Sequence, residues 1–308
     1  MGRFLSDLAA SQPARFGLLV GIGGTVLAVV AWAAIRSAGG RSGPAPWGGA
    51  VMVLSTLALM WRYNRVPTGL VVGVVLLIVG AMLGRRLWEL MVASLPGAAA
   101  VVYWGEAGRA IPEPMLVIAI AAAAALVVDF DRAYRASGAG PALLFLSTVG
   151  VLVTVPDTEL AMGLAAVSLP IGVAGWPLRM VALGPAAAAA VAILAHLAVV
   201  AGNSRPGAAV GVLGALGLML AEPVGRWLGR RTPSALQELA AGGLGGVFLL
   251  GSVHAVLVLG ITRFAGLRRE LLTAAIFAIP FLLVGAILGA APGRPASPEP
   301  GRIETIHS

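Results

Sequence analysis

Two histidines are the ionisable residues that lie deepest within the apolar stretches of this sequence. His196 lies in the stretch Met180–Ala201, and His254 lies in Leu239–Ile261. At about 1.5 Å per helical residue, both rings would lie about 23 Å from the start of their stretches, and therefore at one depth in the outer half of a bilayer. An ionisable residue inside a membrane helix is a functional candidate, and imidazole changes charge near neutral pH. We therefore predict an intramembrane polar site at this pair. The alternative is that each ring bonds only to a neighbouring helix.

Two acids in a short connection would add negative charge on the side of the membrane that these histidines approach. Asp157 and Glu159 stand between two apolar stretches, with no arginine beside them. Carboxylates near an imidazole favour its charged form. We predict that this connection lies outside the cell. We also predict that the two histidines line an outward-facing cavity, which couples entry of a solute or a proton to pH.

Three further acids lie at the ends of apolar stretches and are weaker candidates. Asp129 and Glu222 each precede an arginine by three or four residues, which is the spacing of an ion pair at a helix end. Glu222 also precedes Pro223, and a helix broken there could bind a cation. Asp129 and Asp131 form an Asp-x-Asp, a pattern that would suit a metal or a donor phosphate in a membrane glycosyltransferase.

Other catalytic patterns do not occur in the sequence. It contains no Cys and no Lys, which excludes disulfides, thiolate nucleophiles, Cys-bound zinc, iron–sulfur clusters and a Walker-type Gly-Lys loop. Neither His-Glu-x-x-His nor Gly-x-Ser-x-Gly is present. We therefore assign no catalytic residue and expect no metal and no cofactor.

The composition requires a membrane environment for these residues. Hydrophobic residues make up 59% of the 308 positions and charged residues only 11%, against about 25% charged residues in soluble domains. A water-soluble domain of this size could not bury so much apolar surface, so soluble enzymes and disordered chains are excluded. The net charge of +8 comes from arginines scattered in twos and threes, as in the loops of membrane proteins. The expected partner is the lipid bilayer and not a nucleic acid.

Ten apolar stretches predict membrane-spanning helices and an all-α, polytopic helix bundle. About 20 residues are needed for one crossing, and continuous apolar runs favour helices over a barrel. The ten stretches are Phe16–Ile35, Trp47–Trp61, Val66–Gly84, Pro114–Phe130, Pro141–Val155, Leu160–Trp176, Met180–Ala201, Gly207–Pro223, Leu239–Ile261 and Leu271–Ala291. An eleventh stretch, Trp88–Trp104, contains Pro96-Gly97, so we expect a broken or re-entrant helix there.

The arginines orient the chain and define its regions. With ten crossings, 12 of the 21 arginines share the side of both termini, which places the termini in the cytoplasm. If Trp88–Trp104 also crosses, only the part of the chain before it changes side, and the C-terminus stays in the cytoplasm. We expect a cytoplasmic segment 1–15, a transmembrane domain 16–291, and a disordered, proline-rich cytoplasmic tail 292–308. A similarity between segments 138 residues apart suggests two halves, near 16–155 and 160–291. The lack of lysine beside abundant alanine and glycine indicates a bacterial inner-membrane protein.

Glycines four residues apart predict close contacts between helices. Such pairs leave bare backbone on one helix face, which lets a neighbouring helix approach. The pairs are Gly17/Gly21, Gly69/Gly73, Gly80/Gly84, Gly207/Gly211, Gly242/Gly246 and Gly285/Gly289. We expect Gly211 and Gly246 to face neighbouring helices rather than lipid. The alternative is a dedicated face for a homodimer or a membrane partner.

Three classes of function fit these expectations. The first is a permease or transporter of a small solute, which requires a polar cavity reaching the middle of the bilayer. The alternative is a non-catalytic partner subunit or scaffold in cell-envelope metabolism, which requires a filled core and an exposed face of small residues. The third is a membrane-embedded enzyme acting on a lipid-linked substrate, which requires acids or histidines clustered at one interface. The sequence favours the transporter, and it does not identify the substrate.

Overall fold

The computed structural model describes residues 11–39, 43–63, 66–104, 113–152, 154–155, 158–204, 206–229, 233–267 and 271–293. Over these residues the chain forms thirteen α-helices, one short 3-10 helix and no strand, which confirms the all-α prediction. In chain order the elements are α2 (Gln12–Gly39), α3 (Gly48–Arg62), α4 (Thr68–Leu83), α5 (Leu87–Tyr103), α6 (Glu113–Tyr134), η1 (Arg135–Ser137), α7 (Ala139–Val151), α8 (Thr158–Gly175), α9 (Ala187–Ser204), α10 (Pro206–Gly214), α11 (Leu218–Gly229), α12 (Ala235–Ala241), α13 (Leu244–Leu267) and α14 (Leu271–Ala290). The predicted tail beyond Gly293 and the first ten residues lie outside the described residues.

Three helical segments are individually long and apolar enough to cross a membrane: Gln12–Ala38, Glu113–Ser137 and Leu244–Phe264. The pair α10 and α11 adds a fourth span if the two helices, bent by 66°, are taken together. In α3, α4, α5, α7, α8, α9 and α14 the apolar segments among the fully described residues are only 10 to 17 residues long. The described helices are therefore compatible with a membrane protein and include three to four full-length candidate spans. Helix length does not confirm the prediction of about ten spans.

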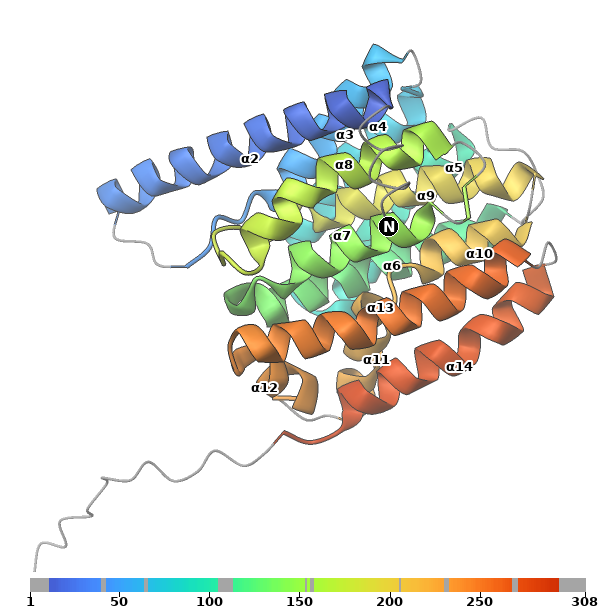
Figure 1. The fold of residues 1–308 in the computed structure, drawn as a ribbon. Coiled ribbons are helices and arrows are strands. Elements are labelled where there is room, and N and C mark those ends of the chain that lie inside the picture. The colour runs from blue at the N-terminus through green and yellow to red at the C-terminus, as the bar shows by residue number, and fades with distance from the viewer. Residues whose placement is uncertain are drawn as a thin grey trace, which may run out of the picture.

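Helices that follow one another in the sequence run in alternating directions between two ends of one bundle (Figure 1). The close contacts of α4 and α5 show this, because Gly84 lies against Leu90 while Gly69 lies against Trp104. In the same way α13 runs antiparallel to α10. Helices that are not consecutive can run parallel, as α11 and α14 do. We call the end of the bundle that contains α12 the α12 end.

The helix α5 differs from the prediction for its stretch. It is one continuous helix with Pro96 inside it. Gly97, next to this proline, lies so close to Leu77 that α5 packs tightly against α4 over this segment. Proline removes one backbone hydrogen bond, and the packing against α4 keeps the helix in register across it. The expectation of a broken or re-entrant helix is therefore wrong.

Arg132, near the end of α6, caps the end of α4. Its guanidinium donates hydrogen bonds to the carbonyl oxygens of Ala81 (2.9 Å), Gly84 (2.8 Å) and Arg85 (3.2 Å). The last carbonyls of a helix have no partner within the helix, and a cation there also interacts well with the helix dipole. The side chain of Arg132 thus caps the C-terminal end of α4 and connects α6 by hydrogen bonds to the turn between α4 and α5.

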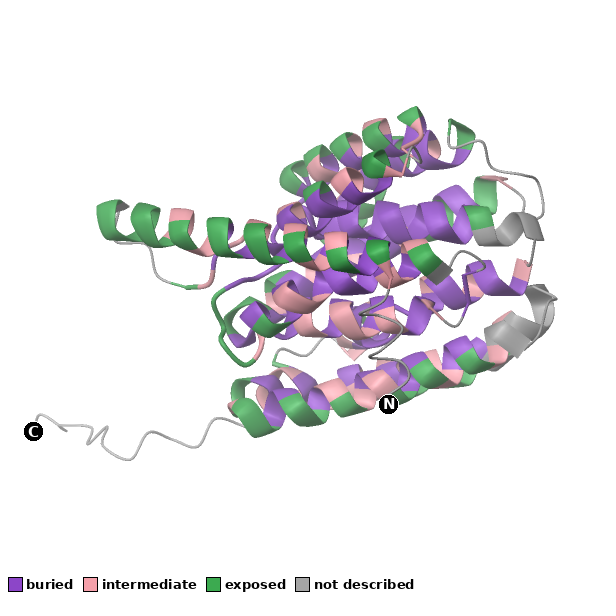
Figure 2. Ribbon diagram, turned by 45° about the horizontal axis from the view of Figure 1, so that its top comes forward, coloured by how far each residue is buried: buried purple, intermediate pink, exposed green. Residues whose placement is uncertain are grey.

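The core is centred on α9 (Figure 2), whose side chains from Ala187 to Ala198 are all buried. This helix is rich in alanine, so α3, α4, α5, α6 and α10 can pack closely around it.

The first helix of one predicted half, α2, packs against the first helix of the other, α8, through Gly17 and Gly21. The division into halves remains a prediction.

The two glycines expected to face helices do lie in the interior. Gly211 is buried in α10. Gly246 is also buried, and a Cβ added to it would collide with the carbonyl oxygen of Leu239.

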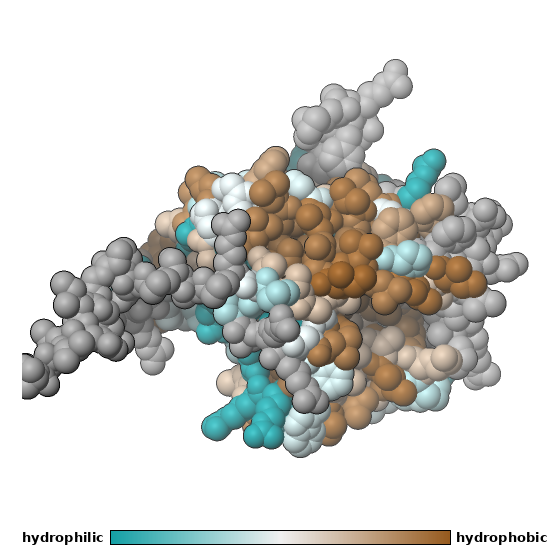
Figure 3. All heavy atoms as spheres, turned by 90° about the horizontal axis from the view of Figure 1, so that it is seen from below, coloured by the Kyte–Doolittle hydropathy of each residue, from teal (hydrophilic) through white to brown (hydrophobic). Residues whose placement is uncertain are grey.

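The outer helices expose apolar side chains, as the broad hydrophobic surface in Figure 3 shows. On α14 these are Ile276, Ile279, Leu283, Val284 and Ile287.

Candidate functional site

The helix pair α10 and α11 is interrupted at Ala215–Gly217, where the axis turns by 66°. Gly217 has a φ of +47°, and a Cβ on it would lie 3.1 Å from the ring of His254. Glycine is therefore required both by the backbone conformation and by the close approach. The predicted break at Glu222-Pro223 is wrong, because α11 continues through Pro223, which lies in the middle of this helix. There it removes only one hydrogen bond, whereas the glycine turn allows a full change of direction.

His254 fills the inside of this break. Its Nδ1 accepts a hydrogen bond from the backbone N–H of Leu218 (3.2 Å), one of the first donors of α11. Its Nε2 lies 3.1 Å from Oγ of Ser147, whose hydroxyl also lies 2.9 Å from the Leu143 carbonyl oxygen. Since an N–H can only donate, the neutral ring carries its proton on Nε2 and donates it to Ser147. The fully buried imidazole therefore joins α7, α11 and α13.

His196 occupies a different environment. Its ring lies among Thr56, Leu160 and Leu164 in a space too small for a water molecule, and its Nδ1 has no hydrogen-bond partner among the described residues. The neighbours of the two rings have no residue in common, so the described residues do not form one cavity lined by both. A shared depth in a membrane remains a prediction: the two histidines lie nine and ten residues after the first residues of α9 and α13, at the α12 end. This is about 14–15 Å rather than 23 Å, because both helices begin later than predicted.

Glu159 does not line the space around either histidine ring. Glu159 lies in the first turn of α8, where its exposed side chain lines a shallow recess with Pro13, Leu59 and Tyr63. Asp157 lies outside the described residues. That these acids favour the charged form of the histidines therefore remains a prediction.

A second group of polar side chains, which we call the charge cluster, joins α6, α11 and the start of α12. It consists of Asp129, Tyr134, Glu222, Arg226 and Ser234. Nη2 of Arg226 lies 2.6 Å from Oδ2 of Asp129, and its Nε lies 3.2 Å from Oε1 of Glu222. The Ser234 hydroxyl donates to the same Glu222 oxygen at 3.0 Å. The predicted pairing of Glu222 with Arg226 is confirmed, whereas Asp129 pairs with Arg226 and not with Arg132.

Two buried oxygens in the charge cluster make no hydrogen bond of good geometry among the described atoms, Oε2 of Glu222 and the hydroxyl of Tyr134, although the two side chains are close enough to interact with each other. An unpaired buried polar atom is costly, and such atoms often mark a bound water, ion or proton. The cluster also has two carboxylates for one guanidinium, so it carries one net negative charge when both are ionised. A proton on Oε2 of Glu222 would remove that charge.

The Asp-x-Asp pattern is divided between two structural tasks. Asp131 is buried and accepts hydrogen bonds from the backbone N–H groups of Leu183 and Gly184, both at 2.9 Å. It therefore holds the connection between α8 and α9 against the end of α6. Asp129 is paired with Arg226 instead. The two carboxylates are thus directed to different partners, and this arrangement does not present them together to a metal or a phosphate.

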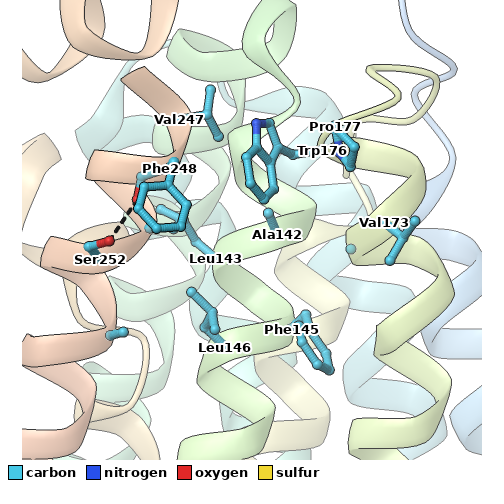
Figure 4. A pocket seen from close by; sticks show the side chains of 13 residues that line it. Ala142, Leu143, Phe145, Leu146, Val173, Trp176, Pro177, Val247, Phe248 and Ser252 are labelled. Atoms are coloured by element: carbon cyan, nitrogen blue, oxygen red, sulfur yellow. Dashed lines mark hydrogen bonds between the residues drawn. The ribbon is translucent and has the colours of Figure 1, made fainter. Parts of the chain in front are cut away.

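An apolar groove lies between α8 and α13, with α7 as its floor (Figure 4). Its volume is about 390 Å³, and no ionisable side chain lines it. Trp176 and Phe248 stand on opposite walls, and Nε1 of Trp176 has no hydrogen-bond partner in the described part of the chain. Sequence reasoning missed this groove, because its lining consists of apolar residues like those of any membrane helix.

Comparisons with known proteins leave the site to be interpreted from its own chemistry. No known protein family matches the chain, and no curated protein does. The helix break with His254 and the adjoining charge cluster are therefore the features from which a function is argued.

Proposed function

We propose that this chain is a multi-pass membrane transporter of a small solute, with its transport site at the break between α10 and α11. The observation that carries this proposal is the interrupted helix itself, packed against His254 and followed by the buried carboxylate of Glu222. Discontinuous helices with ionisable groups near the break are the usual sites of substrates and coupling ions in secondary transporters. Glu222 lies four residues after Leu218, about 6 Å along the axis of α11.

The charge cluster is the proposed place of proton coupling. Protonation of Glu222 would weaken its hydrogen bond with Arg226 and leave the guanidinium paired with Asp129 alone. The contact between α11 and α6 would then remain while the contact within α11 is loosened. The glycine turn at Gly217 supplies the hinge about which α11 would move.

The alternating helices favour eleven crossings over ten. The eleven are α2 to α9 with one crossing each, the pair α10–α11, α13 and α14. The eleventh crossing comes from α5, which is continuous and follows α4 along its length. In this arrangement 12 of the 21 arginines belong to the α12 end. The positive-inside rule then places that end and the C-terminus in the cytoplasm of a bacterial inner membrane, and the N-terminus outside.

Cysteine labelling tests this topology, because the native chain has no cysteine. In intact cells, a membrane-impermeant maleimide should label Glu159→Cys, whose position is exposed at the end opposite α12. It should not label Pro300→Cys until the cells are permeabilised. Labelling of Pro300→Cys in intact cells would contradict the orientation. Equal labelling of both variants after permeabilisation is the control for expression.

A non-transporting partner subunit is the second candidate function. It is favoured by the filled core around α9, where every side chain from Ala187 to Ala198 is buried. The two functions differ in whether water reaches the middle of the bundle. A transporter must open its site to one side during its cycle, whereas a scaffold has no need to do so.

Ser147 distinguishes these functions, because it is fully buried beside His254. If the chain is a transporter, Ser147→Cys should react with a charged, impermeant methanethiosulfonate within minutes, as the site opens. Ala190→Cys, in the filled core of α9, is the matched control and should stay unreactive. A Ser147→Cys variant as inert as Ala190→Cys, beside a reactive Glu159→Cys, would reject the transporter in favour of the scaffold.

A further inference from the structure

A recess at the α12 end brings together two arginines from distant parts of the chain. The end of α2 projects beyond the neighbouring helices (Figure 1), and the recess lies between it and the turn that follows α8. Its volume is about 420 Å³. The residues that define this α2 recess are Trp32, Arg36, Pro44, Leu178, Arg179 and Met180.

The positive charge of the α2 recess has no counter-charge among the described residues that line it. Arg36 and Arg179 both line it, and both are exposed. Neither side chain forms an ion pair or a hydrogen bond with the described residues, and no carboxylate lines the recess. A guanidinium offers several N–H donors in a planar fork that matches phosphate oxygens, so two of them form a natural site for a phosphate.

Arg179 is held in its place by an unusual backbone. It has a φ of +52°, the one positive value at a described residue other than glycine. The turn is fixed by hydrogen bonds from the N–H of Arg179 to Gly175 (2.9 Å) and from that of Met180 to Ala174 (2.8 Å). Backbone strain of this kind costs free energy and occurs often at ligand sites. Here it directs an arginine, rather than glycine, to the rim of the α2 recess.

The surroundings of the two arginines are apolar. Leu178 is 56% exposed and Met180 is 44% exposed, on either side of Arg179. Trp32 lies in the recess and donates a hydrogen bond from its indole to the Gly43 carbonyl (3.0 Å). Exposed apolar residues and a tryptophan beside cations are typical of the level at which lipid headgroups meet acyl chains. A ligand that matches this combination is amphipathic as well as anionic.

We propose that the α2 recess binds the headgroup phosphate of an anionic phospholipid from the leaflet at the α12 end. Basic pockets between membrane helices bind such headgroups. Arg36 and Arg179 would hold the phosphate, while Leu178 and Met180 would contact the first segments of the acyl chains. A free phosphate would use the arginines but not these apolar side chains. This inference does not depend on the transport proposal, because the recess shares no residue with the helix break or the charge cluster.

The test counts lipids bound to the purified full chain by native mass spectrometry, with phosphatidylglycerol or phosphatidylcholine of the same chains. The wild type should retain one phosphatidylglycerol at concentrations where phosphatidylcholine is lost. The double variant Arg36→Gln/Arg179→Gln should bind phosphatidylglycerol about tenfold more weakly than the wild type does. The variant Arg36→Lys/Arg179→Lys keeps the charge and should recover part of the affinity.

The matched control is Arg62→Gln/Arg263→Gln, which removes two exposed charges at the opposite end of the bundle. It should bind phosphatidylglycerol like the wild type. Equal weakening in both double variants would overturn the proposal, because the attraction would then depend on net charge alone. Displacement of the lipid by millimolar inorganic phosphate would also overturn it, in favour of a soluble anion. An unfolding midpoint of Arg36→Gln/Arg179→Gln equal to that of the wild type in phosphatidylcholine shows that the fold is intact.

Discussion

Replacing Arg226 with methionine should lower the free energy of unfolding by about 3–5 kcal/mol, the usual cost of removing one partner from a buried ion pair. Arg226 holds two carboxylates, at 2.6 Å and 3.2 Å. Its loss would leave Glu222 fully buried with only the Ser234 hydroxyl as a partner. The measurement is the unfolding transition of the purified protein in mixed detergent micelles with increasing dodecyl sulfate.

Two further variants separate the charge effect from the packing effect. Arg263→Met removes an exposed arginine and should change stability by less than about 0.5 kcal/mol. The double variant Glu222→Gln/Arg226→Met removes the stranded carboxylate as well, so it should regain a part of the loss. If Arg226→Met unfolds like the wild type, the charge cluster contributes nothing to stability. In that case its ion pairs do not anchor α11 to α6.

Replacing Gly225 with valine should cost about 1–3 kcal/mol or more, because it forces α11 away from α14. A Cβ at this position would collide with the carbonyl oxygen of Ala286, which is backbone and cannot turn aside. Gly289 of α14 also lies close to the backbone of Glu222, so the two helices meet along a seam of bare backbone. The expected result is a lower unfolding midpoint in the same assay.

Gly23 provides the control for this substitution. It is exposed on α2, and no atom lies within 4 Å of a Cβ added to it. Gly23→Val should therefore leave the midpoint nearly unchanged, since the helix loses a glycine and gains no collision. Equal midpoints for Gly225→Val and Gly23→Val would show that the close approach of α11 and α14 is not maintained in the membrane.

The sequence predicted well those features that depend on local composition. The all-α class follows from continuous apolar runs, and the pairing of Glu222 with Arg226 follows from their spacing on one helix. The ends of the helices were less predictable. Apolar residues continue through the loop before α9 and through α12, so hydropathy alone placed the starts of two helices too early.

The tertiary partners of the site residues were not predictable, because nothing local encodes them. Asp129 is paired across 97 positions with Arg226, and Asp131 bonds to backbone groups more than 50 positions away. The helix break could be inferred only roughly. Both Gly217 and Pro223 interrupt helices in general, and the choice between them depends on His254, which occupies the inside of the turn.

The arginine cap on α4 has a consequence for the lipid around the protein. Arg132 donates hydrogen bonds to the last carbonyl oxygens of α4, so these groups need neither water nor a further helical turn as partners. This helix can therefore end after 16 residues, about 24 Å. It is shorter than the hydrocarbon core of a typical bilayer, about 30 Å, whereas α2, with 28 residues, is about 42 Å long. The protein therefore presents unequal hydrophobic lengths on its perimeter. In a bilayer, acyl chains beside α4 would compress and α2 would tilt or project, so the thickness of the bilayer would vary around one molecule.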